Sequence, residues 1–355
     1  MLFQLKLRDF RCFESLSLEF GSGASAFVGR NAQGKTSILE AVCVLLRLQS
    51  PRASKSDHFV RIGAQGFFVE GEWNGVPLQY SSAGTRKRLA ADGSVCRKRA
   101  DYLASSGLVV WMGNTDLELV RGSGENRRRF LDFAASQLHA GYGEALRNYD
   151  RALRARNFLF KRDARPDWKS IDAYTQLLVE HGKTLTEQRA DLASVLQPLT
   201  DEAYRQISLG ECAPVGLRYM SGAGDGDFEH AFENSREEDA RRRQTTVGPH
   251  RDDLEIQIGE MPASQFASEG QQRSIALAMK LAQANVLREL RNQSPILLVD
   301  DIFGELDPPR RNALFSAFPA DSQKLLTTTH LDWADEAVSN GLKIFEVSGG
   351  RVSPE

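Results

Sequence analysis

The stretch that most constrains this chain is Val28-Gly-Arg-Asn-Ala-Gln-Gly-Lys-Thr-Ser37, in which two glycines separated by four residues are followed by a lysine and a hydroxyl. In this spacing, backbone N–H groups wrap phosphates, the lysine reaches the outer phosphates and the hydroxyl binds Mg²⁺. The apolar run over residues 24–28 predicts a buried strand, and residues 36–46 have apolar side chains at helical spacing. The loop is therefore expected at a helix N-terminus, where free N–H groups favour an anion. The residues expected to bind ATP here are Gly29, Arg30, Asn31, Ala32, Gln33, Gly34, Lys35 and Thr36.

The second element of this site is Pro295-Ile-Leu-Leu-Val-Asp-Asp301, an apolar strand that ends in two carboxylates. Enzymes with such a phosphate loop place their metal-linked acid at the end of a strand of this kind. Asp300 is therefore expected to bind Mg²⁺ together with Thr36, and Asp301 to orient or deprotonate the attacking water. Two elements of one site, on strands far apart in sequence, indicate a nucleotide hydrolase more strongly than the loop alone.

A third motif, Ala267-Ser-Glu-Gly-Gln-Gln-Arg273, precedes a run with helical periodicity over residues 274–290. It resembles the signature motif of ABC-type ATPases, which completes the nucleotide site of the opposite subunit. The resemblance implies that Ser268, Gly270 and Gln271 approach the γ-phosphate of ATP held by a partner subunit, at a helix N-terminus. Gly304-Glu-Leu-Asp307 resembles the D-loop that follows the two carboxylates. Together these motifs imply an ATPase head that dimerises around ATP.

Composition limits where the protein works and what it contacts. No window approaches 18 uninterrupted apolar residues, and the first residues lack the basic start and long apolar core of a signal peptide. A cytoplasmic protein with no membrane partner is therefore expected. The net charge of −2 excludes a uniformly basic surface, so any contact with nucleic acid must come from a local patch.

Two segments are candidates for such a patch. Ala91-Asp92-Gly93 predicts a hairpin turn whose arms carry Arg86-Lys87-Arg88 and Arg97-Lys98-Arg99. These side chains either contact phosphates or protect a solvated edge strand from aggregation. The helical window over residues 142–161 has an apolar stripe, and its other faces either meet DNA phosphates or are simply solvated. The arginines of that window are Arg147, Arg151, Arg154 and Arg156.

The order of the strand and helix signals predicts an α/β fold. The resemblance of the motifs to ABC-type ATPases implies an ABC-type P-loop ATPase head, with a mixed sheet and a parallel core sheet covered by helices, into which a helical arm is inserted. The head is expected over residues 1–110 and 245–355, and the arm with the signature side over 111–244. Long helical windows at 142–161 and 174–196 form the arm.

The span between phosphate loop and signature is too short for the long coiled coil of SMC-like proteins. The remaining motifs resemble the RecF family of bacterial DNA replication and repair proteins, in the family's order from Leu5 to about Leu314. They are Leu7-Arg-Asp-Phe-Arg-Cys-Phe13, Asn31-Ala-Gln-Gly-Lys-Thr36, Asp116-Leu-Glu-Leu-Val-Arg-Gly-Ser123, Arg127-Arg-Arg-Phe-Leu-Asp132, Arg156-Asn157 and Val247-Gly-Pro-His-Arg-Asp-Asp-Leu254. The chain departs from the family at Asn114 and Gly124, where the family usually has proline.

The RecF resemblance implies an ATP-dependent DNA-binding protein whose dimer closes with ATP and Mg²⁺ and clamps DNA at junctions of single and double strands. It also implies cooperation with RecR and RecO in loading RecA, support of SOS induction, and a nucleoid-associated location in the cytoplasm. Asp301 replaces the longer glutamate of transporter ATPases, which predicts weak, DNA-linked ATP hydrolysis suited to a switch. The rival interpretations are an ATPase subunit of a membrane transporter, another SMC-like chromosome protein, and a small-molecule kinase.

Two residues carry two interpretations each. Arg11 follows the first predicted strand and either reaches the nucleotide or forms a structural ion pair. His330, at the end of Leu326-Thr-Thr-Thr-His330, lies where ABC ATPases place a catalytic switch histidine, and is either that residue or a capping or surface residue. The Q-loop is expected at residues 111–114, which contain no glutamine, so no metal ligand is assigned from them.

Overall fold

The computed structural model describes residues 1–52, 56–162, 166–209, 213–224, 226–331, 333 and 341–354. Its contacts divide the chain into unit 1, Met1–Thr115 with Leu287–Glu355, and unit 2, Asp116–Val286. The first boundary, expected at 110/111, lies at 115/116. The second, expected at 244/245, lies instead at 286/287, because the segment between these positions joins unit 2. In that segment β10 (Asp253–Ile258) pairs with β9 (Val215–Met220), and Lys280 forms a 3.1 Å ion pair with Asp116.

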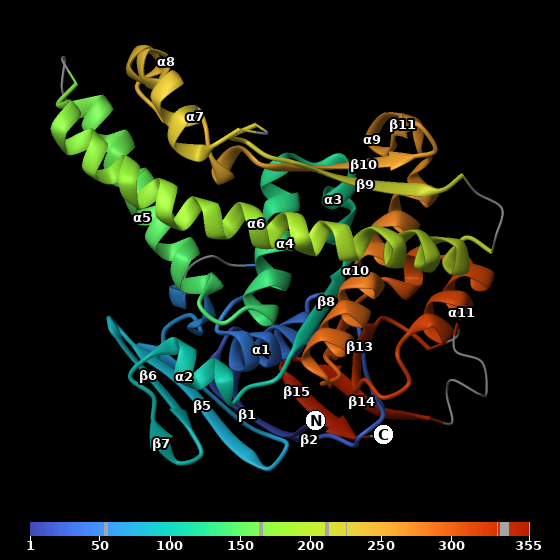
Figure 1. Ribbon diagram of the computed structural model, residues 1–355. Helices are drawn as coiled ribbons and strands as arrows, with labels where there is room; N and C mark the ends of the chain where they lie inside the picture. Colours follow the sequence, from blue (N-terminus) through green and yellow to red (C-terminus); the bar gives the residue numbers. More distant parts are fainter. Residues whose placement is uncertain are drawn as a thin grey trace. The chain divides into compact units, whose positions relative to one another are not determined.

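Unit 1 contains a six-stranded sheet in the order β2-β1-β4-β5-β6-β7 (Figure 1). Its strands are β1 (Leu2–Phe10), β2 (Phe13–Glu19), β4 (Gly66–Trp73), β5 (Val76–Ala83), β6 (Arg86–Ala91) and β7 (Ser94–Val95). Alternate residues are buried: Phe67 and Val69 face the core, whereas Phe68 between them is partly exposed. Every neighbouring pair is antiparallel, where a mixed sheet was predicted, because most of these strands are joined by short hairpins.

The second sheet of unit 1 has the order β15-β14-β3-β13-β12-β8. Its strands are β3 (Ala24–Val28), β8 (Val109–Gly113), β12 (Ile296–Asp300), β13 (Lys324–Thr328), β14 (Leu342–Ser348) and β15 (Arg351–Pro354). All neighbours are parallel except the edge pair β14 and β15. β8 is buried at every position and β12 at all but its last, as expected of a parallel sheet covered on both faces. The predicted α/β class with a parallel core sheet is confirmed.

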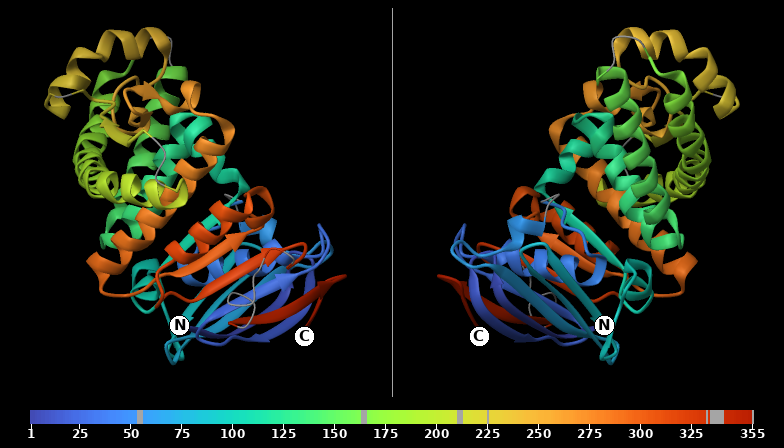
Figure 2. Two further views of the ribbon diagram at one scale, coloured as in Figure 1. Left: turned by 90° about the vertical axis from the view of Figure 1, so that its right-hand side faces the viewer. Right: turned by 90° about the vertical axis from the view of Figure 1, so that its left-hand side faces the viewer.

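Helix α1 (Lys35–Arg47) contacts strands of both sheets (Figure 2). Residues 38–47 are all buried, because a helix enclosed on several sides needs no polar face. The other helical elements from this part of the chain are η1 (Ser56–Phe59), α2 (Arg99–Ala104), η2 (Asn114–Leu117), η4 (Phe303–Glu305) and α11 (Pro308–Ala317).

Unit 2 is dominated by the paired helices α5 (Tyr142–Arg162) and α6 (Trp168–Ile207). In α6, buried Ile171, Leu178 and Leu185 recur every seven residues, which gives the helix a continuous apolar seam. Its other elements are α3 (Glu118–Arg121), α4 (Gly124–Leu138), α7 (Phe228–Asn234), α8 (Arg236–Arg242), η3 (Pro249–Arg251), β11 (Met261–Pro262), α9 (Ala263–Phe266) and α10 (Glu269–Arg291), which continues into unit 1. Among the helices of the described ranges, none has the length and apolar run that a membrane crossing requires.

Candidate functional site

Three neighbouring strands of the parallel sheet bring the predicted site residues together. β13 lies between β3 and β12, so the segments that follow their carboxyl ends share one edge of the sheet. Backbone hydrogen bonds join these segments at that edge. The N–H of Gly29 donates to the carbonyl of Thr328 at 3.3 Å, and the N–H of Asp301 donates to that of Thr327 at 3.2 Å. The phosphate loop and the two carboxylates are therefore adjacent in space.

Space and backbone conformation require glycine at two positions of the loop. A Cβ on Gly29 would lie 2.2 Å from the carbonyl oxygen of Val347, and Gly34 has a φ of +109°. The side-chain oxygen of Gln33 accepts a 2.7 Å hydrogen bond from the N–H of Gly349, which ties the loop to the turn after β14. The hydrogen bond of Gln33 and the close packing at Gly29 thus fix the shape of the loop. Its exposed residues are Arg30, Asn31 and Ala32.

The ammonium group of Lys35 is folded back onto this loop. Its Nζ donates to the carbonyl oxygens of Gly29 at 2.5 Å and Arg30 at 3.0 Å, and the residue is 6% exposed. Burial lowers the pKa of Lys35, and the nearby carboxylates of Asp301 and Asp300 oppose that shift. The cation is therefore held where an incoming phosphate can replace the two carbonyl oxygens as its partner.

Thr36 and Asp300 meet as the sequence predicts. The Thr36 hydroxyl donates to Oδ1 of Asp300 at 2.7 Å, and the Thr327 hydroxyl donates to the same oxygen at 2.8 Å. Hydroxyl and carboxylate oxygens are ligands that Mg²⁺ accepts alongside water and substrate phosphates, so the residues present fit that ion. Thr327 was not among the predicted site residues. The only signal for it was its place in the threonine run before His330.

Asp301 lies beside this pair in a left-handed backbone conformation with φ of 54°. Burial raises the pKa of its carboxyl group, Lys35 lowers it, and Asp300 raises it. His330 also lowers this pKa, so the histidine lies within electrostatic reach of Asp301. Its side chain is exposed, and its carbonyl accepts a 2.8 Å hydrogen bond from the hydroxyl of Thr328. The net result is a carboxylate that is a stronger base than an exposed aspartate.

Arg11 is paired with Glu40 of α1. Its Nε and Nη2 donate to the two carboxylate oxygens at 2.8 and 2.6 Å, and the Glu40 side chain is fully buried. The hydroxyl of Ser50 donates to the same carboxylate at 2.5 Å. Of the two interpretations of Arg11, the structure shows the structural ion pair, and a nucleotide contact would compete with it.

The signature segment lies in unit 2, at the start of α10. Ser268 and Gln271 form a reciprocal capping box. The N–H of Gln271 donates to Oγ of Ser268 at 3.3 Å, and the N–H of Ser268 donates to the Gln271 side chain at 2.8 Å. Gln272, to which no sequence motif assigns a role, is buried and donates to the carbonyl of Ala267 at 2.9 Å. The exposed Ser268 and the partly exposed Gly270 thus lie at the N-terminus of a long helix, a position that favours an anion.

The second arm of the predicted basic hairpin is shorter than expected. β6, the turn at Asp92 and Gly93, and β7 form the hairpin, and Arg86, Lys87 and Arg88 are exposed on β6. The second arm ends at Val95. Arg99 begins α2, and its side chain donates to the carbonyl of Leu48 at 3.1 Å, so residues 97–99 are not part of the hairpin.

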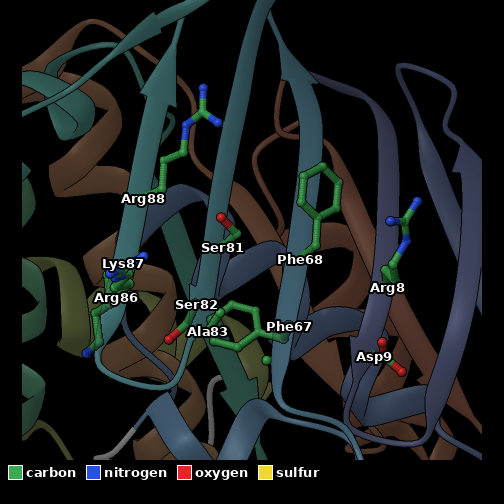
Figure 3. Close-up of a pocket in the computed structure, with 11 residues that line it drawn as sticks. Arg8, Asp9, Phe67, Phe68, Ser81, Ser82, Ala83, Arg86, Lys87 and Arg88 are labelled. Carbon is green, nitrogen blue, oxygen red and sulfur yellow. The ribbon is translucent and has the colours of Figure 1, made fainter.

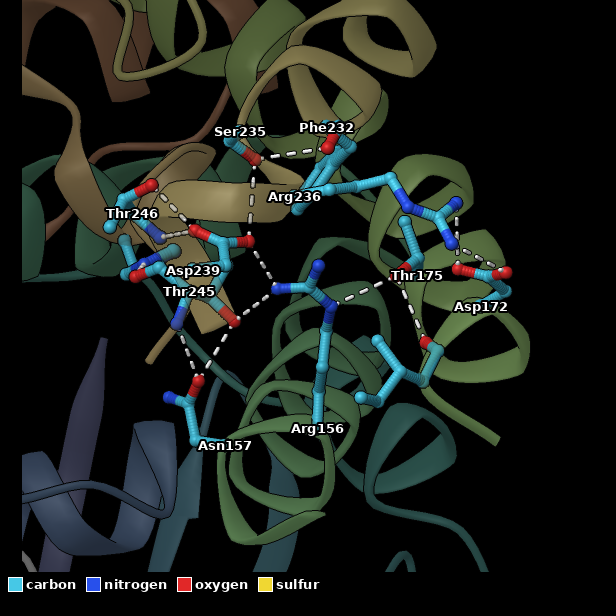
Figure 4. Close-up of polar contacts among 12 residues, drawn as sticks. Arg156, Asn157, Asp172, Thr175, Phe232, Ser235, Arg236, Asp239, Thr245 and Thr246 are labelled. Carbon is cyan, nitrogen blue, oxygen red and sulfur yellow. Dashed lines mark hydrogen bonds and ion pairs between the residues drawn. The ribbon is translucent and has the colours of Figure 1, made fainter. Parts of the chain in front are cut away.

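The predicted cationic face of α5 must also be corrected, at Arg156. Arg147, Arg151 and Arg154 are exposed, but Arg156 is 1% exposed. Figure 4 shows its guanidinium group among side chains of α6, α8 and the segment after α8. It donates to Asp239 at 2.7 Å, Thr245 at 2.8 Å and Thr175 at 2.9 Å. Arg156 cannot contact DNA in this arrangement, because a buried carboxylate balances its charge.

A second buried network explains other segments that resemble the RecF family. The fully buried Asp252 accepts hydrogen bonds from Arg189 at 2.8 Å and from the N–H of Gly222 at 2.7 Å, and another from the Tyr219 hydroxyl. Arg189 also donates to Asp132 at 2.8 Å. The motifs over residues 127–132 and 247–254 are therefore joined inside unit 2, which is a structural role that sequence alone did not reveal.

Known sequences that match this chain indicate its family. A family model described as an AAA domain matches residues 4–196. The chain is 34% identical to the DNA replication and repair protein RecF of Lactococcus lactis subsp. cremoris (strain MG1363), over 99% of this chain and 98% of that protein. It is also 34% identical to the protein of that name from Synechococcus sp. (strain JA-2-3B'a(2-13)), over 99% of this chain and 97% of the other.

Solved structures share the fold. The structure of the recombination mediator protein RecF-ATPrS in the RecFOR pathway superposes with a TM-score of 0.88 at 24% identity, covering 100% of this chain and 98% of that one. An Smc head bound to the C-winged helix domain of ScpA superposes with a TM-score of 0.57 at 17% identity, covering 100% and 96%. Because the sequence relatives match along nearly the whole chain, this chain belongs to the RecF family of DNA replication and repair proteins.

Proposed function

We propose that this protein is an ATP-switched DNA-binding ATPase of recombinational repair and replication. The observation that carries the proposal is the 2.7 Å hydrogen bond between Thr36 and Asp300, since it joins the phosphate loop to the carboxylate pair. Lys35 lies close enough to Asp300 and Asp301 for both to shift its pKa, so the cation, the hydroxyl and the acids form one site. The ATPase domain that the AAA family model identifies contains the same loop.

Each residue of the site is assigned one task in binding ATP. Lys35 and the loop N–H groups bind the phosphates, with Lys35 exchanging its two carbonyl partners for phosphate oxygens. Thr36 and Asp300 hold Mg²⁺, which when bound neutralises charge on the phosphate oxygens. Thr327 keeps the Asp300 carboxylate in position.

Asp301 is assigned to the attacking water. Its carboxylate accepts a proton while the water oxygen bonds to the γ-phosphorus and the bond from that phosphorus to the leaving oxygen of ADP breaks. The raised pKa of Asp301 increases its affinity for this proton. Aspartate has one methylene fewer than glutamate, so hydrolysis is slow and serves as a switch. His330, exposed at the same sheet edge, is assigned the switch position beside the γ-phosphate.

The signature segment is assigned to the nucleotide of a second copy of this chain. Ser268, Gly270 and Gln271 lie at the exposed start of α10, where a hydroxyl and a helix N-terminus can meet a γ-phosphate. ATP then forms part of the interface, so the homodimer depends on ATP.

The closed dimer is proposed to bind DNA at junctions of single and double strands. Membership of a family of DNA replication and repair proteins supports this partner. RecR and RecO are proposed as partners in loading RecA, with support of SOS induction and a nucleoid-associated place in the cytoplasm, on the same ground. Family membership also disfavours a transporter subunit. ATP-dependent binding of DNA is not expected of such a subunit, so it distinguishes the two interpretations.

The test is fluorescence anisotropy with a labelled DNA that has one junction of single and double strand. Tight binding is expected with a slowly hydrolysed ATP analogue and Mg²⁺, and much weaker binding without nucleotide. Equal binding in both conditions would contradict the ATP switch, and no binding in either would contradict the assignment of DNA as the partner.

A further inference from the structure

A groove on the outer face of the antiparallel sheet is lined by four cationic residues and by one partly exposed aromatic ring. It has a volume of about 390 Å³ and is lined by residues of β1, β4, β5 and β6 (Figure 3). The ring belongs to Phe68, which is partly exposed, whereas the neighbouring Phe67 is 3% exposed and packs into the core. The cationic residues that line the groove are Arg8, Arg86, Lys87 and Arg88.

The strand register sets these groups in a row. Arg8 is opposite Phe68, Phe68 is opposite Ser81, and Ser81 is opposite Arg88. Because directly opposed residues of an antiparallel sheet point to the same face, the ring and the hydroxyl lie between two guanidinium groups. Three strand spacings separate Arg8 from Arg88, a span of roughly 14 Å. The row is therefore wide enough for a few nucleotides of one strand.

The positive charge of this groove is not neutralised from within. The one carboxylate of the lining, Asp9, accepts a 2.8 Å hydrogen bond from Arg61 and is paired with it. Among the residues that the structure describes, no carboxylate forms an ion pair with the four lining cations. A cluster of unpaired cations on a protein of net charge −2 marks a local site for an anion.

We propose that this groove binds a short run of unpaired nucleotides, with one base stacked on Phe68 and the flanking phosphates held by Arg8 and Arg88. The proposal rests on DNA being the partner of this protein. A duplex covers the faces of its bases, so it would engage the cations and leave the ring unused. An exposed single strand can contact both the cations and the ring. Ser81, in the middle of the row, adds a hydroxyl that can form a hydrogen bond with it.

The experiment compares a labelled oligothymidylate with a duplex of the same length, by anisotropy with Mg²⁺ and a slowly hydrolysed ATP analogue. Phe68→Leu is expected to weaken binding of the single strand roughly 5- to 160-fold, as expected for loss of one base stack. Binding of the duplex is expected to stay unchanged. Arg8→Gln combined with Arg88→Gln is expected to flatten the dependence of log K on log salt by about 1.4, since each lost phosphate contact on a single strand removes about 0.7.

Matched controls are available in the same chain. Phe3→Leu removes an exposed ring of β1 and Arg351→Gln removes an exposed arginine of β15, both outside the groove, so neither should change the affinity for oligothymidylate. Unchanged single-strand affinity in Phe68→Leu, or equal losses for single strand and duplex, would overturn the proposal. Competition by hexaglutamate would also overturn the proposal, if this peptide displaces the oligothymidylate and binds Phe68→Leu and wild type with equal affinity. The surface would then suit an acidic peptide.

The failure of this proposal is separable from that of DNA binding itself. A wild-type protein that binds neither oligothymidylate nor the duplex would overturn both DNA as the partner and the groove as its site. If the wild type binds DNA and all groove variants bind it equally well, only the assignment of the groove is overturned. Thermal unfolding of each variant checks that the sheet is intact, as expected for side chains on the solvent face.

Discussion

The hydroxyl of Thr36 donates a 2.7 Å hydrogen bond to Asp300, and Thr327 donates a second one to the same oxygen at 2.8 Å. One carboxylate oxygen of β12 therefore gathers donors from α1 and β13. Asp300 is thus oriented before any ligand arrives, which reduces the entropy that ligand binding must overcome.

Replacing Lys35 with methionine should weaken ATP binding by about 2 to 4 kcal/mol, because a buried charge contact to phosphate is lost. The expected rise in Kd is roughly 30- to 1,000-fold, measured by isothermal titration with Mg²⁺ and ATP. Lys161→Met removes an exposed lysine of α5 and should leave the Kd unchanged. An equal Kd for Lys35→Met and wild type would refute the phosphate loop as the ATP site.

Replacing Asp301 with asparagine should leave ATP bound but slow its hydrolysis, since an amide cannot accept a proton from water. The backbone should be undisturbed, because asparagine tolerates the positive φ of 54° at this position. Single-turnover hydrolysis is expected to fall by about 10²- to 10⁴-fold, the usual contribution of a general base. If the turnover rate does not change, another group positions the water.

Replacing Ser268 with arginine should abolish ATP-dependent dimerisation and spare ATP binding by the monomer. The exposed serine lies at the start of α10, where a bulky cation would block the approach of a second subunit's nucleotide. Sedimentation velocity with Mg²⁺ and ATP, beside a direct nucleotide-binding assay, measures both properties.

The control for this variant is Ser194→Arg, which places the same side chain on an exposed position of α6 and should dimerise like wild type. Ser268→Ala separates the loss of the helix cap, worth about 1 kcal/mol, from the effect of bulk. A Ser268→Arg protein that still dimerises on ATP would show that the signature does not complete a partner's site.

Replacing Arg156 with leucine should destabilise the protein by about 3 to 5 kcal/mol, since it leaves the buried Asp239 carboxylate without its cation. Urea unfolding, followed by circular dichroism, measures the change in midpoint. Arg151→Leu, on an exposed position of the same helix, should lie within about 0.5 kcal/mol of wild type. Equal midpoints for the two variants would contradict the structural role of Arg156.

Acid should destabilise the protein through His250. Its Nε2 is 3.0 Å from the carbonyl oxygen of Thr245, which can only accept, so Nε2 carries the proton and Nδ1 accepts from the Tyr149 hydroxyl at 2.8 Å. Burial lowers the pKa of His250 from 6.5 to about 4, with smaller contributions from neighbouring charges. The unfolded chain thus binds more protons than the folded chain between these two values.

The corresponding loss of stability sets in as pH falls below about 6.5 and amounts to about 2 kcal/mol between pH 7 and pH 5. Above pH 7 this histidine contributes no slope. Urea unfolding of wild type and His250→Gln at both pH values measures the effect, and the difference between the two proteins should shrink as the pH is lowered. A constant difference would mean that His250 titrates normally in the folded protein.

Local patterns were sufficient to predict much of the fold. The helix predicted at 142–161 is α5, at 142–162, and the strands predicted at 24–28 and 295–301 are β3, at 24–28, and β12, at 296–300. Apolar periodicity and turn residues act over a few positions, so one sequence displays them directly. The motifs likewise predicted that Thr36 and Asp300 would meet, because a known spacing links each to one ligand.

Properties set by tertiary contacts could not be predicted in this way. Arg156 follows the buried Tyr149 by seven residues, which places it on the buried face of its helix, but no local pattern identifies the distant Asp239 as the carboxylate that pairs with it there. The unit boundary at 286/287 depends on the pairing of β9 with β10, which no local signal specifies. Arg11 was ambiguous for the same reason, since its partner Glu40 is identified only by the fold.

The place of β3 in its sheet has a consequence for how the protein is made. β3 (Ala24–Val28) lies between β13 (Lys324–Thr328) and β14 (Leu342–Ser348), and Val347 and Gly349 hold the loop that follows it. A ribosome releases β3 early and its two neighbours much later, so a nascent chain that has not reached Leu342 cannot hold the loop after β3 in its final shape. The candidate site at this sheet edge therefore forms only after both strands that flank β3 have been synthesised.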